Sequence, residues 1–109
     1  MKQLPRSECA ILSLVLEGEW YDMIASGEKK EEYRDNKLFW RKRITNVIYK
    51  AHNEDELIVV AFSLGYKKQD MCYVADKIFC AEGSNHPEWG EPETPHYVIK
   101  LGERVELVD

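Results

Sequence analysis

The apolar residues of this chain gather in short runs that predict buried strands. The clearest run is Leu-Ile-Val-Val-Ala-Phe-Ser at residues 57–63, which is followed by a glycine turn. Such runs predict four strands, at residues 10–16, 57–63, 71–80 and 97–101, the last continued by 105–108 after Gly102. We expect the third of these strands to bend or bulge near Asp76 and Lys77. Alternatively, the last segment folds back on itself as a hairpin.

Helical spacing appears directly after the first predicted strand. Trp20, Met23 and Ile24 recur at i, i+3 and i+4, which predicts a short helix with one apolar face. We expect this helix to end at Ser26-Gly27, because glycine adopts the left-handed cap conformation without a steric penalty. A helix this short must be stabilised by packing against the preceding strand.

A second, longer helix is predicted over residues 37–51, with Asn36 as its N-cap. Its apolar positions at helical spacing include Ile44, Val47 and Ala51. Residues 46–49 also fit a strand, so this alternative stays open. Residues 52–56 are predicted to form a polar turn.

Between the two helices, residues 29–35 predict an extended segment that is polar on both sides. Lys30, Glu32 and Arg34 alternate with Glu31, Tyr33 and Asp35 along it. A strand without an apolar face is poor core material. We therefore expect this strand at the edge of a sheet or facing a polar cavity.

Residues 81–95 contain three of the four prolines and predict a loop wrapped around Trp89. The whole pattern predicts a single domain, residues 1–109, of α+β class and mainly β, with five to six strands and two helices in the N-terminal half. Because many short strands leave edges that need protection, we expect a small β-barrel or a strongly coiled sheet.

Composition excludes several classes of protein. A chain of 109 residues is too short for a doubly wound dinucleotide fold or an eight-fold barrel. It has no apolar stretch near the ~18 residues of a membrane span and no apolar signal segment, so we expect a cytoplasmic protein without membrane contact. The three cysteines and three histidines lack ligand spacings. We expect buried free thiols, no metal and no cofactor.

The net charge of −5 conceals one basic segment. Residues 28–43 hold seven basic and four acidic side chains, a net charge of +3, so the rest of the chain carries −8. The local potential of this segment could attract an anion that the acidic remainder would repel. A solvated charged face is the plainer interpretation.

The candidate chemistry lies at the start of this basic segment, directly after the predicted glycine turn. Lys29 offers a compact cation, Arg34 a planar fork for a carboxylate or phosphate, and Glu32 an acceptor for either base or for the amino edge of a nucleobase. Three such groups side by side suit an anionic ligand rich in hydrogen-bonding groups. The alternative is a surface ion-pair network worth less than ~1 kcal/mol.

Several separated pieces carry a family resemblance from about residue 12 to 102. They are Trp20-Tyr-Asp-Met-Ile-Ala-Ser-Gly27, Glu28-Lys-Lys-Glu-Glu-Tyr-Arg34, Trp40 with the basic residues after it, Phe62-Ser-Leu-Gly-Tyr66, Pro87-Glu-Trp-Gly90 and Tyr97-Val-Ile-Lys-Leu-Gly102. In this order they resemble the ASCH domain family, whose fold is a small β-barrel of PUA type. The resemblance implies an RNA-binding module.

Some small ASCH proteins are hydrolases, and one group removes the acetyl group of acetylcytidine as an amidohydrolase. In that group the element reads Gly-x-Lys-Thr-x-Thr-x-Arg, with the lysine and the second threonine among the catalytic residues. Here Gly27, Lys29 and Arg34 match, but Lys30 and Glu32 replace the two threonines. A hydroxyl nucleophile cannot be supplied by Glu32, although Glu32 can still position a water molecule.

Aromatic residues outside this element supply weaker candidates. Tyr66, with Lys67 and Lys68, is expected at the barrel mouth, either stacking on a base or covering the end of the barrel. Trp89 either offers a stacking platform or, as we favour, pins its loop to the core. We expect the other two tryptophans, Trp20 and Trp40, to pack on helices.

These observations leave three hypotheses. The first is an RNA- or nucleotide-binding module, with ligand-binding residues Lys29, Lys30, Glu32, Arg34, Tyr66 and Lys67. The second is a small hydrolase, an amidohydrolase or ribonuclease, with Lys29 and Glu32 as catalytic residues. The third is an adaptor whose acidic surface meets a protein partner.

Overall fold

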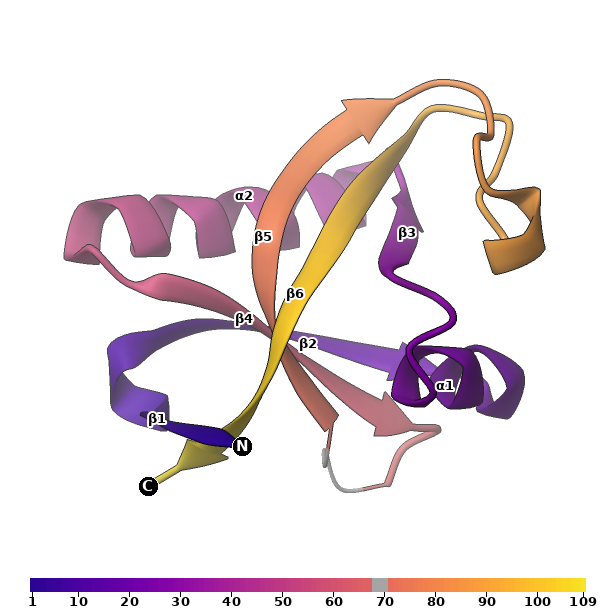
Figure 1. The fold of residues 1–109 in the computed structure, drawn as a ribbon. Coiled ribbons are helices and arrows are strands. Elements are labelled where there is room, and N and C mark those ends of the chain that lie inside the picture. Colours follow the sequence, from indigo (N-terminus) through magenta and orange to yellow (C-terminus); the bar gives the residue numbers. More distant parts are fainter. Residues whose placement is uncertain (68–70) are drawn as a thin grey trace.

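The computed structural model describes residues 1–67 and 71–109 (Figure 1). In these residues it contains six strands and two α-helices. The strands are β1 (Lys2–Pro5), β2 (Cys9–Leu16), β3 (Glu31–Asp35), β4 (Leu57–Leu64), β5 (Met71–Ala81) and β6 (His96–Val108). The helices are α1 (Gly18–Ala25) and α2 (Leu38–Glu54), with single 3₁₀ turns η1 (Arg6–Glu8) and η2 (Pro87–Trp89). The α+β, mainly β class with two helices is thereby confirmed.

The six strands form one mixed sheet in the order β1-β6-β5-β4-β2, with β3 also paired to β6. β2 runs parallel to β4, and β1 runs parallel to the end of β6, whereas the other pairs are antiparallel. β6 is long enough to pair with β3 along its first half and with β1 along its second half. Within the described residues no strand joins β2 to β3, so the sheet stays open there. Of the two expected forms, a small β-barrel or a strongly coiled sheet, the barrel is therefore not closed.

The core lies on both faces of the sheet because side chains alternate along a strand. Val60 and Phe62 of β4 join the main cluster beneath the helices, together with Leu12, Leu14, Leu16, Ile24, Ile44, Met71, Tyr73 and Ile99. Their neighbours Val59 and Ala61 point to the opposite face and pack with Cys9, Cys72 and Val105. All four of these β4 residues are fully buried. Burial on both faces explains why β4 has the longest apolar run in the sequence.

The two helices follow the predictions with corrections at the termini. α1 ends as expected before Gly27, whose φ of +86° is the left-handed conformation that glycine accommodates. α2 is continuous through residues 46–49, which settles the strand alternative in favour of the helix. It runs to Glu54, so the predicted turn at 52–56 begins too early. Lys37 rather than Asn36 is the N-cap residue, and it makes no side-chain capping bond.

The remaining differences concern the strands near the two termini. β1 is a strand because it pairs with β6, although it is only four residues long and mostly exposed, and the sequence did not predict it. β6 continues through Gly102 as one strand rather than as a hairpin. The bend of β5 is present as register shifts between Tyr73 and Lys77. Among the described residues no helix is long and apolar enough to cross a membrane.

Candidate functional site

A cleft of about 370 Å³ lies where the sheet is open, between the end of β2 and β3. α1 and the start of α2 contribute side chains to it, and Trp89 and Gly90 of the 82–95 loop, which carries η2, line one side. Its lining residues are Val15, Leu16, Glu17, Trp20, Lys29, Glu32, Tyr33, Arg34, Asp35, Trp40, Trp89 and Gly90. The predicted glycine turn therefore delivers Lys29, Glu32 and Arg34 to one concave surface.

Glu32 is the centre of a short chain of ion pairs in this cleft. One carboxylate oxygen lies 3.3 Å from the Lys29 amine, and the other accepts a hydrogen bond of 2.6 Å from the Arg34 guanidinium. Lys29 and Glu32 are 2% and 6% exposed, so these pairs are buried rather than solvated. The prediction of three adjacent groups is confirmed, and the alternative of an exposed surface network does not describe this geometry.

Lys29 is held from several directions. Its amine donates a 2.6 Å hydrogen bond to the backbone carbonyl of Trp89 and lies 5.1 Å and 4.5 Å from the ring centres of Trp20 and Tyr33. Burial lowers the pKa of the Lys29 amine from its ordinary value, although the neighbouring Glu32 opposes this change. The amine is therefore easier to deprotonate than a lysine amine in water.

Arg34 links the two open edges of the sheet. Its Nη2 atom donates to the outward carbonyl of Val15 on β2, at 3.0 Å, as well as to Glu32. The guanidinium lies 4.8 Å from the ring centre of Trp40, and the guanidinium of Arg43 lies 5.3 Å from the same ring. Arg43 in turn donates to the outward carbonyl of Ser13. Nε of Arg34 is buried and has no hydrogen-bond partner among the described residues.

The floor of the cleft carries one net positive charge when Lys29 is protonated, because two cations flank a single carboxylate. Two exposed carboxylates, Glu17 and Asp35, also line the cleft. The cleft thus combines a positive, buried floor with negative side chains in contact with solvent. This arrangement suits a polar ligand that carries little charge beyond its inner end.

All three tryptophans of the chain line this cleft. We predicted that Trp20 and Trp40 pack on helices; both do, and both also form cleft walls. Trp89 has two roles, since its carbonyl binds Lys29 while its ring stacks on His86 at 4.1 Å between centroids. Because the three tryptophans are 20 and 49 positions apart, no local pattern in the sequence indicated that they line one cleft. A tertiary fold was needed to bring them together.

The other predicted ligand-binding residues lie outside the cleft. Lys30 is exposed and lines a second hollow of about 540 Å³ on the far side of the glycine turn. Tyr66, 98% exposed, and Lys67 line a third hollow, which shares residues 15–17 with the cleft. Lys68 falls outside the described residues.

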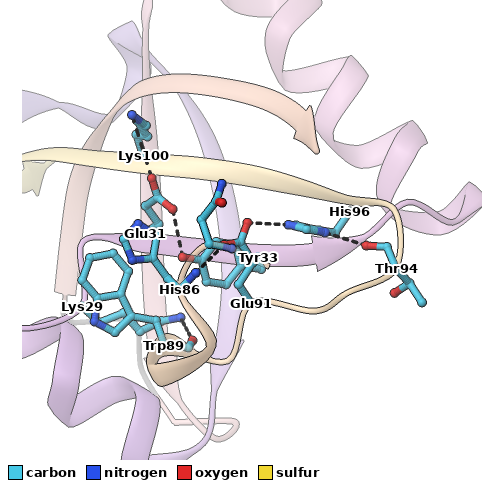
Figure 2. A network of polar contacts seen from close by, with 10 residues as sticks. Lys29, Glu31, Tyr33, His86, Trp89, Glu91, Thr94, His96 and Lys100 are labelled. Carbon is cyan, nitrogen blue, oxygen red and sulfur yellow. Dashed lines mark hydrogen bonds and ion pairs between the residues drawn. The ribbon is translucent and has the colours of Figure 1, made fainter. Parts of the chain in front are cut away.

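A second buried network, which the sequence did not reveal, lies beside the cleft in the 82–95 loop (Figure 2). Glu91 accepts hydrogen bonds from the backbone N–H groups of Asn85 and His86 with one oxygen, at 2.7 and 2.9 Å. Its other oxygen lies 2.8 Å from Nε2 of His96, which is completely buried. Nδ1 of His96 faces the carbonyl of Thr94 at 2.6 Å.

Tyr33 connects this network to β3. Its ring meets His96 edge-on at 5.7 Å, and its hydroxyl donates a 2.9 Å hydrogen bond to Glu31 (Figure 2). Burial and the adjacent Glu31 raise the pKa of Tyr33 far above its ordinary value, so the phenol stays protonated. Glu31 also lies 4.0 Å from the Lys100 amine.

In the described part of the chain, no group of histidine, cysteine and carboxylate side chains could hold a metal ion. Cys9 and Cys72 are buried as predicted, whereas Cys80 is exposed. It lies in the twisted part of β5, where the strand leaves the core, so the expectation of a buried filler was wrong for this residue.

No protein-family model, curated protein or solved structure gives a significant match to this chain.

Proposed function

We propose that the cleft binds a nucleotide, a nucleoside or a single base of RNA, and that the chain is a cytoplasmic binding module of the ASCH type. One observation carries this proposal: a buried Lys29–Glu32–Arg34 cluster forms the floor of a cleft with indole walls. Ligand sites of this kind combine aromatic lining with a few charged groups that fix orientation.

The chemistry of the cleft favours a base with a short anionic group. Base stacking on an aromatic side chain contributes ~1–3 kcal/mol, and Trp20, Trp40 and Trp89 border the space in which a base would lie. The excess positive charge of the floor favours an acceptor-rich edge or a phosphate. Tyr66 and Lys67, in the adjoining hollow, would contact a neighbouring nucleotide.

The acidic remainder of the chain limits the length of nucleic acid that can bind. Outside residues 28–43 the chain carries a net charge of −8, which repels phosphates away from the cleft. A mononucleotide or a short single strand therefore fits better than a long duplex.

Tryptophan fluorescence tests the proposal directly, because every tryptophan lies in the cleft. Nucleoside monophosphates and short single-stranded RNA should quench it saturably at low salt, and more weakly as salt rises. Arg34→Met should weaken binding about tenfold. The matched control Arg104→Met changes an exposed arginine of β6 and should leave binding unchanged. An absence of quenching by every nucleotide and RNA at millimolar ligand and low salt would exclude this function.

A hydrolase acting on a modified nucleoside is the second candidate, favoured by the lowered pKa of Lys29 beside Glu32. In hydrolysis of an acetylated base, water would add to the acetyl carbonyl carbon and lose one proton to Glu32 or to Lys29. The C–N bond would then break as that proton passes to the leaving nitrogen, giving the free amine and acetic acid, which ionises in solution. Incubation with acetylated nucleosides and with RNA tests this activity. Turnover that Lys29→Ala leaves unchanged would remove the hydrolase mechanism.

The internal ion pairs of the cleft also fit the adaptor hypothesis, because Lys29 and Arg34 are already partnered without a ligand. The same titration separates the two. Saturable quenching that Arg34→Met weakens supports the binding module, whereas a complete lack of response leaves the adaptor as the better account.

A further inference from the structure

The 82–95 loop forms one wall of the cleft, and the buried carboxylate of Glu91 lies at the centre of its hydrogen bonds. Glu91, 6% exposed, accepts both the Asn85 and His86 N–H groups and contacts His96 at the start of β6. It thereby ties both sides of the η2 turn to the first residue of β6. Figure 2 shows the loop folded around this side chain.

The same loop reaches the floor of the cleft two residues earlier. The carbonyl of Trp89 accepts the 2.6 Å hydrogen bond from the Lys29 amine. Between them, Gly90 has a φ of +80° and lies so close to Trp20 that a Cβ atom would meet the indole at 3.0 Å. Because Gly90 is tightly packed, the position of Glu91 determines where the Trp89 carbonyl lies, and this carbonyl accepts the hydrogen bond from Lys29.

We propose that Glu91 is a positioning residue of the cleft: by anchoring the 82–95 loop it sets the Trp89 carbonyl, and through that carbonyl the buried Lys29 amine. Glu91 has no place in the cleft lining, so it acts on a ligand only through these neighbours. The inference about ligand binding rests on the proposed function, whereas the inference about Lys29 does not.

The ionised form of Glu91 suits this anchoring role. Burial alone would raise the pKa of Glu91, but hydrogen bonds from His96 and from the Asn85 and His86 backbone hold it below its ordinary value. Hydrogen bonds from two backbone N–H donors are stronger when the acceptor is a charged carboxylate than when it is neutral.

Two variants of Glu91 and one matched control test the proposal. Glu91→Ala removes the anchor, Glu91→Gln keeps its shape and one acceptor, and Glu82→Ala changes an exposed glutamate at the start of the same loop. The measurements are the pKa of the Lys29 amine, followed by NMR of its side chain, and the affinity for a nucleoside monophosphate. Thermal unfolding reports separately on stability.

We expect Glu91→Ala to raise the Lys29 pKa toward its ordinary value, because a displaced loop lets water reach the amine. Nucleotide affinity should fall about tenfold. Glu91→Gln should retain much of the lowered Lys29 pKa and of the nucleotide affinity, with a smaller change than Glu91→Ala in each. Glu82→Ala should match the parent protein in both. The exposed Lys50 amine provides an internal control that should not move.

A purely structural role predicts a different outcome. If Glu91→Ala and Glu91→Gln both lower the unfolding temperature but leave the Lys29 pKa unchanged in the folded protein, the positioning role is overturned. Should Glu91→Ala fail to fold, Glu91→Gln alone decides, since a partial shift of the Lys29 pKa is still required. If the parent protein binds no nucleotide, the proposed function fails while the Lys29 measurement still tests Glu91.

Discussion

Glu32 and Glu91 are buried to the same extent, yet the protein surrounds them differently. Both are 6% exposed and both lie beside the β3–β6 strand pair. Glu32 is neutralised by two side-chain cations at the floor of an open cleft. Glu91 is satisfied by backbone N–H groups and a buried histidine inside a closed loop.

This difference separates a recognition site from a structural anchor. The cations around Glu32 outnumber it, so the cluster retains a positive charge that solvent or a ligand can meet. The hydrogen bonds around Glu91 use both of its oxygens within the protein and leave its surroundings sealed. The first arrangement offers donors to a ligand, and the second fixes the wall beside which the ligand would lie.

The largest expected effect is on Glu32. Glu32→Ala leaves Lys29 and Arg34 buried without their carboxylate, and removing one partner of a buried ion pair costs ~3–5 kcal/mol. Urea unfolding should show this loss, whereas Glu28→Ala, an exposed glutamate in the preceding turn, should change stability by less than ~0.5 kcal/mol. If Glu32→Ala lowers the free energy of unfolding by less than ~1 kcal/mol, water must solvate Lys29 and Arg34 in place of the missing carboxylate.

Glu91→Gln should cost ~1–3 kcal/mol at neutral pH, because a charged acceptor is replaced by a neutral one in a buried network. The folded pKa of Glu91 lies below the ordinary value of 4.5, so its stabilisation is complete above pH 4.5 and is lost as pH falls through the folded value. Urea unfolding between pH 7 and pH 3 should show parent and variant converging. Curves that stay parallel would contradict the ionised anchor.

Lys29→Met should cost ~1–2 kcal/mol at neutral pH, because Trp89 and Glu32 each lose a donor. The pH dependence has the same sign as that of Glu91, since both folded pKa values are lowered, but it falls in the range of a lysine amine rather than of a carboxyl group. The lowered folded pKa means that the unfolded chain binds more protons between that value and 10.5, so the parent gains stability over the variant as pH rises through this range. A difference that does not depend on pH would show that the amine is not desolvated.

The smallest expected effect is the difference in stability between alanine substitutions at Gly90 and at Gly83, two glycines that share a φ of +80°. An alanine in this conformation costs ~1–2 kcal/mol at either position. Gly90→Ala also forces its Cβ against Trp20 at 3.0 Å, while Gly83→Ala meets only Glu93 at 4.0 Å. Both variants should therefore unfold at a lower temperature than the parent, with Gly90→Ala the lower of the two, and only Gly90→Ala should alter the tryptophan emission. Equal behaviour of the two would show that Trp20 yields freely.

Local patterns predicted the parts of the fold that depend on local burial. The apolar run of β4 and the i, i+3, i+4 spacing of α1 are properties of consecutive residues, and both elements were predicted. β1 was not predicted, because this short segment becomes a strand only by pairing with β6, about a hundred positions later. The open sheet likewise depends on how far the strands coil, which no segment encodes alone.

The candidate site likewise has a part that local patterns predicted and a part that they did not. Glu32 and Arg34 alternate on one strand and Lys29 precedes it directly, so their proximity follows from local geometry. The sequence did not predict the Glu91–His96 pair, since Glu91 belongs to a proline-rich loop without periodicity and His96 is the first residue of the strand that follows it. Tyr66 follows β4, and no local pattern could show that it lines the neighbouring hollow rather than the cleft.

The arginine bonds along β2 have a consequence for self-association. An exposed strand edge offers unpaired carbonyl groups to strands of other molecules and is a common origin of aggregation. Here the outward carbonyls of Ser13 and Val15 are occupied by Arg43 and Arg34, and both guanidiniums are stacked near Trp40. An incoming strand would have to displace two charged donors before it could extend the sheet. Arg34 and Arg43 thus protect the free edge of β2 against polymerisation with strands of other molecules.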